Sequence, residues 1–61
     1  MMVLCKFINS GTGVDEGVFG VVCDSPFLYM GKPTIMVDSP FGLGGKLKAT
    51  YDGDIWVCDL D

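Results

Sequence analysis

The chain contains no histidine and no arginine, and its only basic side chains are four lysines against eight acidic residues. Proteins that bind nucleic acid usually show a basic stripe and use arginine to hold phosphates and guanine edges. The net charge of -4 therefore argues against direct nucleic-acid binding and against attraction to an anionic membrane surface. Because histidine is the commonest general base, its absence also argues against an enzyme.

Long hydrophobic runs are missing as well. No apolar segment approaches the roughly 18 residues that a membrane-spanning helix needs, and the N-terminal block carries too little positive charge for a signal peptide. The three cysteines, Cys5, Cys23 and Cys58, are odd in number and contain no Cys-x-x-Cys pair. We therefore expect a cytoplasmic protein whose cysteines are small buried side chains, with no disulfide framework and no metal site.

What the sequence does contain is enough apolar material for one core. A chain of 61 residues forms one domain, 1–61, and 49% of its residues are hydrophobic. No segment shows the three-and-four apolar spacing of an amphipathic helix, and nine glycines and three prolines are spread along the chain. These features predict a single small all-β domain.

Three apolar segments predict strands in the first two thirds of the chain, at 3–8, 18–23 and 34–37. The run 18–23 is apolar throughout, which predicts a central strand. The intervening segment 9–17 is rich in glycine and polar residues and is expected to be the longest loop.

The segment 46–60 predicts a C-terminal hairpin. Its two strands flank Asp52-Gly53, a dipeptide favoured by two-residue type I′ turns. This turn implies cross-strand pairs of Tyr51 with Asp54, Thr50 with Ile55 and Ala49 with Trp56.

Five or six short antiparallel strands in so small a chain favour a closed or nearly closed sheet, because closure removes exposed edges. The stretch EGVFGVVCD at 16–24 resembles the Gly-hydrophobic-Gly-Val turn and strand of SH3-like barrels of the translation and transcription type. The resemblance covers nine residues and implies an SH3-like barrel, with a compact β-roll as the alternative. The missing basic face speaks against the RNA role that some of these barrels have.

The sequence Asp-Ser-Pro-Phe occurs twice, at 24–27 and 38–41, each time followed by three residues and Gly-Lys. Proline and aspartate suit a turn that stops a strand, so each copy is expected to end one strand and to feed another that begins near its Gly-Lys. The Gly-Lys pairs lack the other residues of a phosphate-binding loop, so no nucleotide or other cofactor is predicted.

Two interpretations of the repeat stay open. In the first, Phe27 and Phe41 fill the two ends of the fold, and the aspartates cap their turns. In the second, the turns present an exposed partner-binding patch. The predicted patch comprises Phe27, Leu28, Tyr29, Met30, Phe41 and Leu43, rimmed by Asp24 and Asp38.

These features favour a small acidic protein-binding module that occupies the surface of a partner protein, which its charge predicts to be basic. Short chains of this kind are typical of phage or mobile-element inhibitors and accessory factors. The alternative is a structural or assembly protein that forms a homodimer or larger homo-oligomer through its sheet edges and an apolar patch. A third hypothesis is an acidic mimic of nucleic acid.

Overall fold

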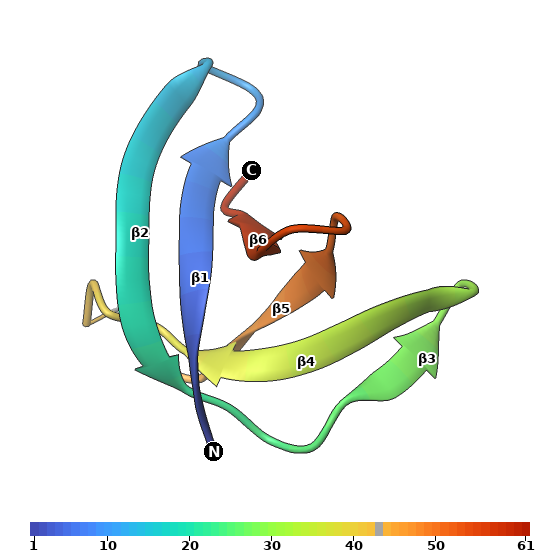
Figure 1. Ribbon diagram of the computed structural model, residues 1–61. Helices are drawn as coiled ribbons and strands as arrows, with labels where there is room; N and C mark the ends of the chain where they lie inside the picture. Colours follow the sequence, from blue (N-terminus) through green and yellow to red (C-terminus); the bar gives the residue numbers. More distant parts are fainter. Residues whose placement is uncertain (43) are drawn as a thin grey trace.

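The computed structural model describes residues 1–42 and 44–61. The described chain forms six strands and no helix (Figure 1): β1 (Met2–Asn9), β2 (Val14–Val22), β3 (Phe27–Tyr29), β4 (Lys32–Asp38), β5 (Lys46–Tyr51) and β6 (Trp56–Asp59). All six belong to one sheet with the order β2-β1-β6-β5-β4-β3. The all-β prediction is therefore confirmed.

The sheet is mixed and is not closed into a barrel, so the predictions of an SH3-like barrel and of purely antiparallel pairing are wrong. Strand β6 lies parallel to β1, with Cys5 opposite Trp56, whereas the other neighbours are antiparallel. A single bridge, between Cys23 and Val37, links the end of β2 to the end of β4. The sequence pattern identifies strands but not their neighbours, and this explains the error.

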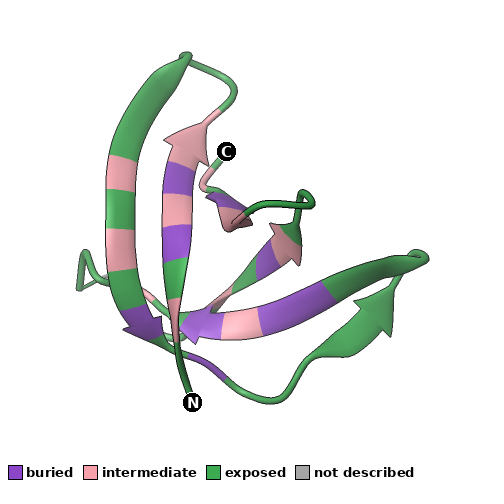
Figure 2. Ribbon diagram, viewed as in Figure 1, coloured by how far each residue is buried: buried purple, intermediate pink, exposed green. Residues whose placement is uncertain are grey.

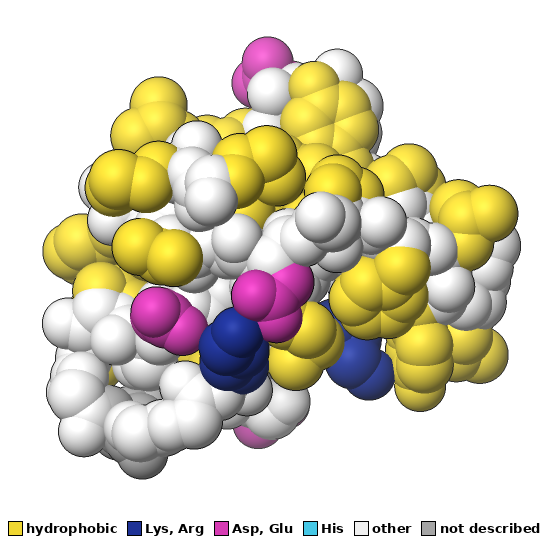
Figure 3. Space-filling view, turned by 90° about the horizontal axis from the view of Figure 1, so that it is seen from below, with side chains coloured by type: hydrophobic (Ala, Val, Ile, Leu, Met, Phe, Trp, Pro, Cys, Tyr) yellow, Lys and Arg dark blue, Asp and Glu magenta, His cyan; other side chains and the backbone are white. Residues whose placement is uncertain are grey.

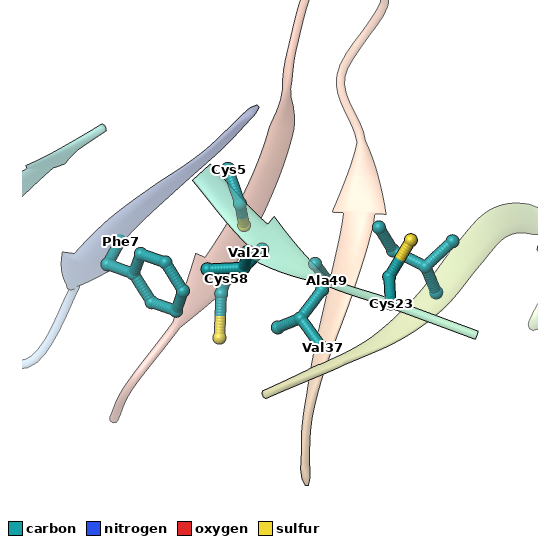
Figure 4. Packing of buried hydrophobic residues seen from close by; sticks show 8 residues of the cluster. Cys5, Phe7, Val21, Cys23, Val37, Ala49 and Cys58 are labelled. Carbon is teal, nitrogen blue, oxygen red and sulfur yellow. The ribbon is translucent and has the colours of Figure 1, made fainter. Parts of the chain in front are cut away.

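The core consists of eight buried hydrophobic residues contributed by every strand except β3 and by the residue that follows β2 (Figure 4): Cys5, Phe7, Val21, Cys23, Ile35, Val37, Ala49 and Cys58. All three cysteines are buried and free, as predicted. Burial and the neighbouring Cys58 raise the pKa of the Cys5 thiol to about 11, and burial also raises the pKa of Cys58. The Cys5 and Cys58 thiols therefore stay protonated at neutral pH and act as small hydrophobic side chains.

The predicted strands at 3–8 and 34–37 lie within β1 and β4, but two predictions about the region between them are wrong. Strand β2 begins at Val14, which shortens the predicted loop 9–17 to four residues. Asn9 organises this turn, since its side-chain oxygen accepts hydrogen bonds from the N–H groups of Gly11 and Thr12. Strand β2 also ends the strand order and is not central. Valines lie on both faces of β2: Val21 is buried in the core, whereas Val18 and Val22 are exposed on the outward face.

The C-terminal hairpin exists, but its predicted register is wrong by two residues. Tyr51 lies opposite Trp56, so the loop runs from Asp52 to Ile55 and is not a two-residue turn. The carboxylate of Asp52 accepts hydrogen bonds from the N–H groups of Asp54, at 2.9 Å, and Ile55, at 2.8 Å. These bonds lower the pKa of Asp52. They favour the longer loop, because an aspartate side chain can replace backbone partners in a turn.

Candidate protein-binding surface

The hairpin formed by β3 and β4 projects from the rest of the molecule (Figure 1) and ends in a tight turn. Tyr29 lies opposite Lys32, so Met30 and Gly31 alone connect the strands. Their φ angles are 53° and 77°. Positive φ at both positions is the requirement of a type I′ hairpin turn, which usually carries asparagine or glycine at the position that Met30 occupies.

Met30 is the only non-glycine residue with a positive φ in the described part of the chain. The left-handed conformation costs an L-residue about 1–2 kcal/mol, and a bulky side chain without local hydrogen bonds recovers none of it. Burial does not compensate, because the Met30 side chain is 85% exposed. Folding alone therefore gives no reason for methionine at this position.

Four consecutive large hydrophobic residues are exposed along this hairpin, and we call them the hairpin patch: Phe27, Leu28, Tyr29 and Met30. Figure 2 shows the whole of β3 as exposed, whereas β1 and β4 both contain buried residues. Successive side chains of a strand point to opposite faces, so Leu28 lies on the other face of β3 from Phe27 and Tyr29. The hairpin patch thus presents hydrophobic side chains in two directions.

Tyr29, beside the turn, and Phe27, at the open end of the hairpin, lie on the same face of β3. The Lys48 ammonium lies 3.7 Å from the centre of the Tyr29 ring, in a cation–π contact. Phe27 lies opposite Thr34, which is fully buried and donates its hydroxyl to the carbonyl of Lys32 at 3.0 Å. The Lys48 contact holds the Tyr29 ring, whereas Leu28 and Met30 are the most exposed members of the hairpin patch.

Phe41, which the sequence prediction placed in the same patch, lies elsewhere. Its ring makes edge-to-face contacts with Phe7, at a centroid distance of 5.3 Å, and with Phe19, at 5.2 Å. It thus packs on the core side of β1 and β2, while Phe27 belongs to the β3–β4 hairpin. Leu43, also predicted for the patch, lies outside the described residues.

The two aspartates of the repeated Asp-Ser-Pro-Phe sequence, Asp24 and Asp38, both lie near Lys46. Lys46 lies opposite Asp38 in the β4–β5 ladder, and its ammonium lies 2.8 Å and 2.9 Å from the two carboxylate oxygens of Asp24. This hydrogen-bonded pair with Asp24 raises the pKa of Lys46, and Asp38 adds to the shift. Figure 3 shows lysine and acidic side chains next to each other among exposed hydrophobic ones. The Asp24 carboxylate therefore links the segment after β2 to the first residue of β5.

A second exposed hydrophobic surface was missed by the sequence prediction. It lies on the outer face of the β1–β2 hairpin and includes Met2, Leu4, Val18 and Val22. The alternation along β1 indicated this surface, because Cys5 and Phe7 lie on one face of the strand and Leu4 on the other. The apolar run of β2 was instead interpreted as burial on both faces.

Within the described residues there is no pocket and no group of three or more cysteine or acidic side chains placed to hold a metal ion. The same residues include no helix that is long and apolar enough to cross a membrane. No protein-family model, no curated protein and no solved structure matches the chain. Function must therefore be argued from the surface.

Proposed function

We propose that the chain is a small protein-binding module that docks on a partner protein through the hairpin patch. The conformation of Met30 carries this proposal, because an exposed methionine occupies a backbone position where asparagine or glycine would be more stable. Strain of this kind often marks a site where function outweighs local stability. Three further exposed hydrophobic residues adjoin Met30, and such clusters mark interaction surfaces.

The shape of the hairpin indicates the kind of contact. A projecting tip with Leu28 and Met30 exposed fits a hydrophobic groove, in which flexible methionine can adapt to irregular walls. The chain would then act by occupying that groove, as an inhibitor or accessory factor does. The net charge of -4 favours a basic partner, because opposite net charges speed association.

The positions of the carboxylates support protein binding over nucleic-acid mimicry. A mimic would need rows of free carboxylates. Asp24 instead holds Lys46, and Asp52 and Asp59 accept hydrogen bonds from backbone N–H groups. These three carboxylates therefore have roles within the fold.

The proposal can be tested by affinity capture from a lysate of the source cells at low and high salt. Wild type should capture one protein in near-stoichiometric amount, and less of it at high salt. The double variant Leu28→Ser/Met30→Ser should capture at least about tenfold less, since two exposed anchors are removed. Val14→Ser is the control, because Val14 is also apolar and exposed, at 47%, but lies at the start of β2.

Equal capture by wild type and the double variant would show that binding does not use the hairpin patch. Capture of no protein by wild type would contradict the proposed function as a whole. Urea unfolding of all three proteins would establish that the variants fold.

A further inference from the structure

The β3–β4 hairpin has two faces, and each of them carries part of the hairpin patch. Residues directly opposite each other in an antiparallel pair point to the same face of the sheet. Tyr29 lies opposite Lys32, and Leu28 lies opposite Pro33. Because side chains alternate along a strand, Pro33 shares its face with Ile35 of the core, and Lys32 lies on the other face. Leu28 is therefore on the core side of the sheet, and Tyr29 is on the side away from the core.

On the core side, apolar side chains continue from the hairpin across the sheet. Pro33 and Tyr51 are neighbours, since each lies one residue beyond the end of the β4–β5 register. Tyr51 lies opposite Trp56, and the two rings meet edge to face with a centroid distance of 5.1 Å. The exposed apolar surface of the hairpin thus extends over β3, β4, β5 and β6. We call these residues the core-side row: Leu28, Pro33, Tyr51 and Trp56.

The two faces are bordered by charges of opposite sign. On the face away from the core, the Lys48 ammonium lies 3.7 Å from the centre of the Tyr29 ring, and Lys32 lies opposite the same tyrosine. On the core side, the Tyr51 hydroxyl donates to the carbonyl oxygen of Asp54 at 3.3 Å. The acidic loop between β5 and β6 therefore adjoins the core-side row, whereas lysines border the other face.

Of the two carboxylates in this loop, that of Asp54 is the one accessible to a partner. The carboxylate of Asp52 accepts hydrogen bonds from the N–H groups of Asp54 and Ile55 and so stabilises the loop itself. Asp54 is exposed and contributes only backbone groups to these loop contacts. An ammonium or guanidinium group can pair with a free carboxylate and also lie against an aromatic ring such as Tyr51. The core-side row therefore fits an apolar segment that carries a basic side chain.

We infer that the partner docks on the core-side row and presents a basic side chain to Asp54. This inference rests on the function proposed for the hairpin patch and specifies which side of the hairpin the partner contacts. It agrees with the net charge of -4, which favours a basic partner. The opposite face would repel such a partner, because lysines flank Tyr29 there. Met30 is 85% exposed in the turn and is accessible from the core side as well.

Two tyrosines provide a matched pair of variants that tests the inference. Tyr51 and Tyr29 are 42% and 45% exposed and lie on opposite faces. In affinity capture from the source lysate, Tyr51→Ser should capture about tenfold less of the wild-type partner, because it removes an anchor of the row. Tyr29→Ser should capture as much as wild type. Urea unfolding establishes that both variants fold.

A second pair of variants changes surface charge and serves if Tyr51→Ser unfolds. Asp54→Lys should reduce capture about tenfold at low salt and less at high salt, because salt screens exposed charges. Lys32→Glu is its control on the other face and should capture at least as much partner as wild type. Both positions are exposed, so the fold should tolerate both changes.

Trp56 gives a direct measure of contact, since it is the only tryptophan in the chain. A fluorinated tryptophan at this position has one fluorine resonance, which should shift when the captured partner is purified and added back. An unshifted resonance at saturation would overturn the inference.

Equal capture by wild type and folded Tyr51→Ser or Asp54→Lys would also overturn the inference, as would a loss confined to Tyr29→Ser. If Leu28→Ser/Met30→Ser still abolishes capture in that case, the proposed function stands and only the docking side is wrong. Capture of no protein by wild type would contradict both.

Discussion

The two Asp-Ser-Pro-Phe segments place the same aromatic residue in different surroundings. The rings of Phe27 and Phe41 are almost equally exposed, at 42% and 37%. Phe41 nevertheless contacts two aromatic rings, Phe7 and Phe19, whereas Phe27 lies opposite Thr34 on the projecting hairpin. Identical local sequence thus provides a core contact in one case and part of the exposed hairpin patch in the other.

The difference arises from the strands that each segment connects. The first segment follows β2 and runs alongside β4, where the N–H of Asp24 donates to the carbonyl of Met36 at 3.0 Å. The second leaves β4 and turns back, with the N–H of Phe41 donating to the hydroxyl of Ser39 at 3.2 Å. Turn chemistry therefore determines where the chain bends, and tertiary packing determines where the phenylalanine lies.

The largest difference in stability is expected between two single variants, in which Phe41 or Phe27 is replaced by alanine. Phe41→Ala should lower the free energy of unfolding by about 2–3 kcal/mol, because it removes buried ring area and two edge-to-face contacts. Phe27→Ala should lower it by about 1 kcal/mol or less, since Phe27 is 42% exposed and lies outside the aromatic cluster of Phe7, Phe19 and Phe41. Urea unfolding measures both values, and equal losses would contradict the distinction between the two segments.

The next largest effect should be a gain of stability at the hairpin tip. Met30→Asn should raise the free energy of unfolding by about 1 kcal/mol, because asparagine tolerates the left-handed conformation. Ser25→Asn, at an exposed position between β2 and β3 without a positive φ, is the control and should change stability little. A loss of stability in Met30→Asn would mean that methionine is the better residue for the fold.

A pH-dependent effect is expected at Asp52, outside both repeats. Backbone N–H groups lower its pKa below the ordinary value of 3.8. Its contribution to stability is therefore complete above that value and is lost as the pH falls through the lowered pKa. Asp52→Ala should reduce the urea midpoint at neutral pH and converge with wild type in strong acid. A constant difference at all pH values would contradict this role.

The smallest effect should come from the ion pair of the first repeat. Asp24→Asn should lower the urea midpoint slightly at low salt and less at high salt, because both partners of the Asp24–Lys46 pair are exposed. The raised pKa of Lys46 means that this contribution is present at neutral pH and is lost as the pH rises through that raised value. A salt-independent loss would indicate a different role for Asp24.

Much of the fold could be predicted because strand-forming segments and turn residues are local properties. The strands of β1, β4 and β5 lie where the apolar alternation placed them, and β4 and β5 begin at Lys32 and Lys46, as the repeat predicted. The burial of the three cysteines follows from their low polarity. Each of these predictions depends on only a few neighbouring residues.

The errors concern properties that depend on distant parts of the chain. The parallel pairing of β6 with β1 and the position of β2 at the end of the strand order depend on tertiary packing. The Asp52-Gly53 dipeptide suits a tight turn, but the Asp52 side chain stabilises a longer loop. The tight turn lies instead at Met30-Gly31, where methionine gives no turn signal.

The candidate site was predicted in part. Four residues of the predicted patch are adjacent in sequence, so they could be assigned to one surface without knowledge of the tertiary fold: Phe27, Leu28, Tyr29 and Met30. Phe41 was assigned to the same patch only because its local sequence repeats that of Phe27. The exposed surface formed by Met2, Leu4, Val18 and Val22 depends on how β1 and β2 pair and was not found.

The most direct test of the central claim joins stability and binding in one variant. Met30→Asn should be measured by urea unfolding and by affinity capture from the source lysate, beside wild type. We expect a higher unfolding midpoint together with at least about tenfold weaker capture of the wild-type partner, because asparagine relieves the turn but cannot fill a hydrophobic groove. If the stabilised variant captures the same partner as well as wild type does, Met30 is not a binding residue and the account of the hairpin patch is wrong.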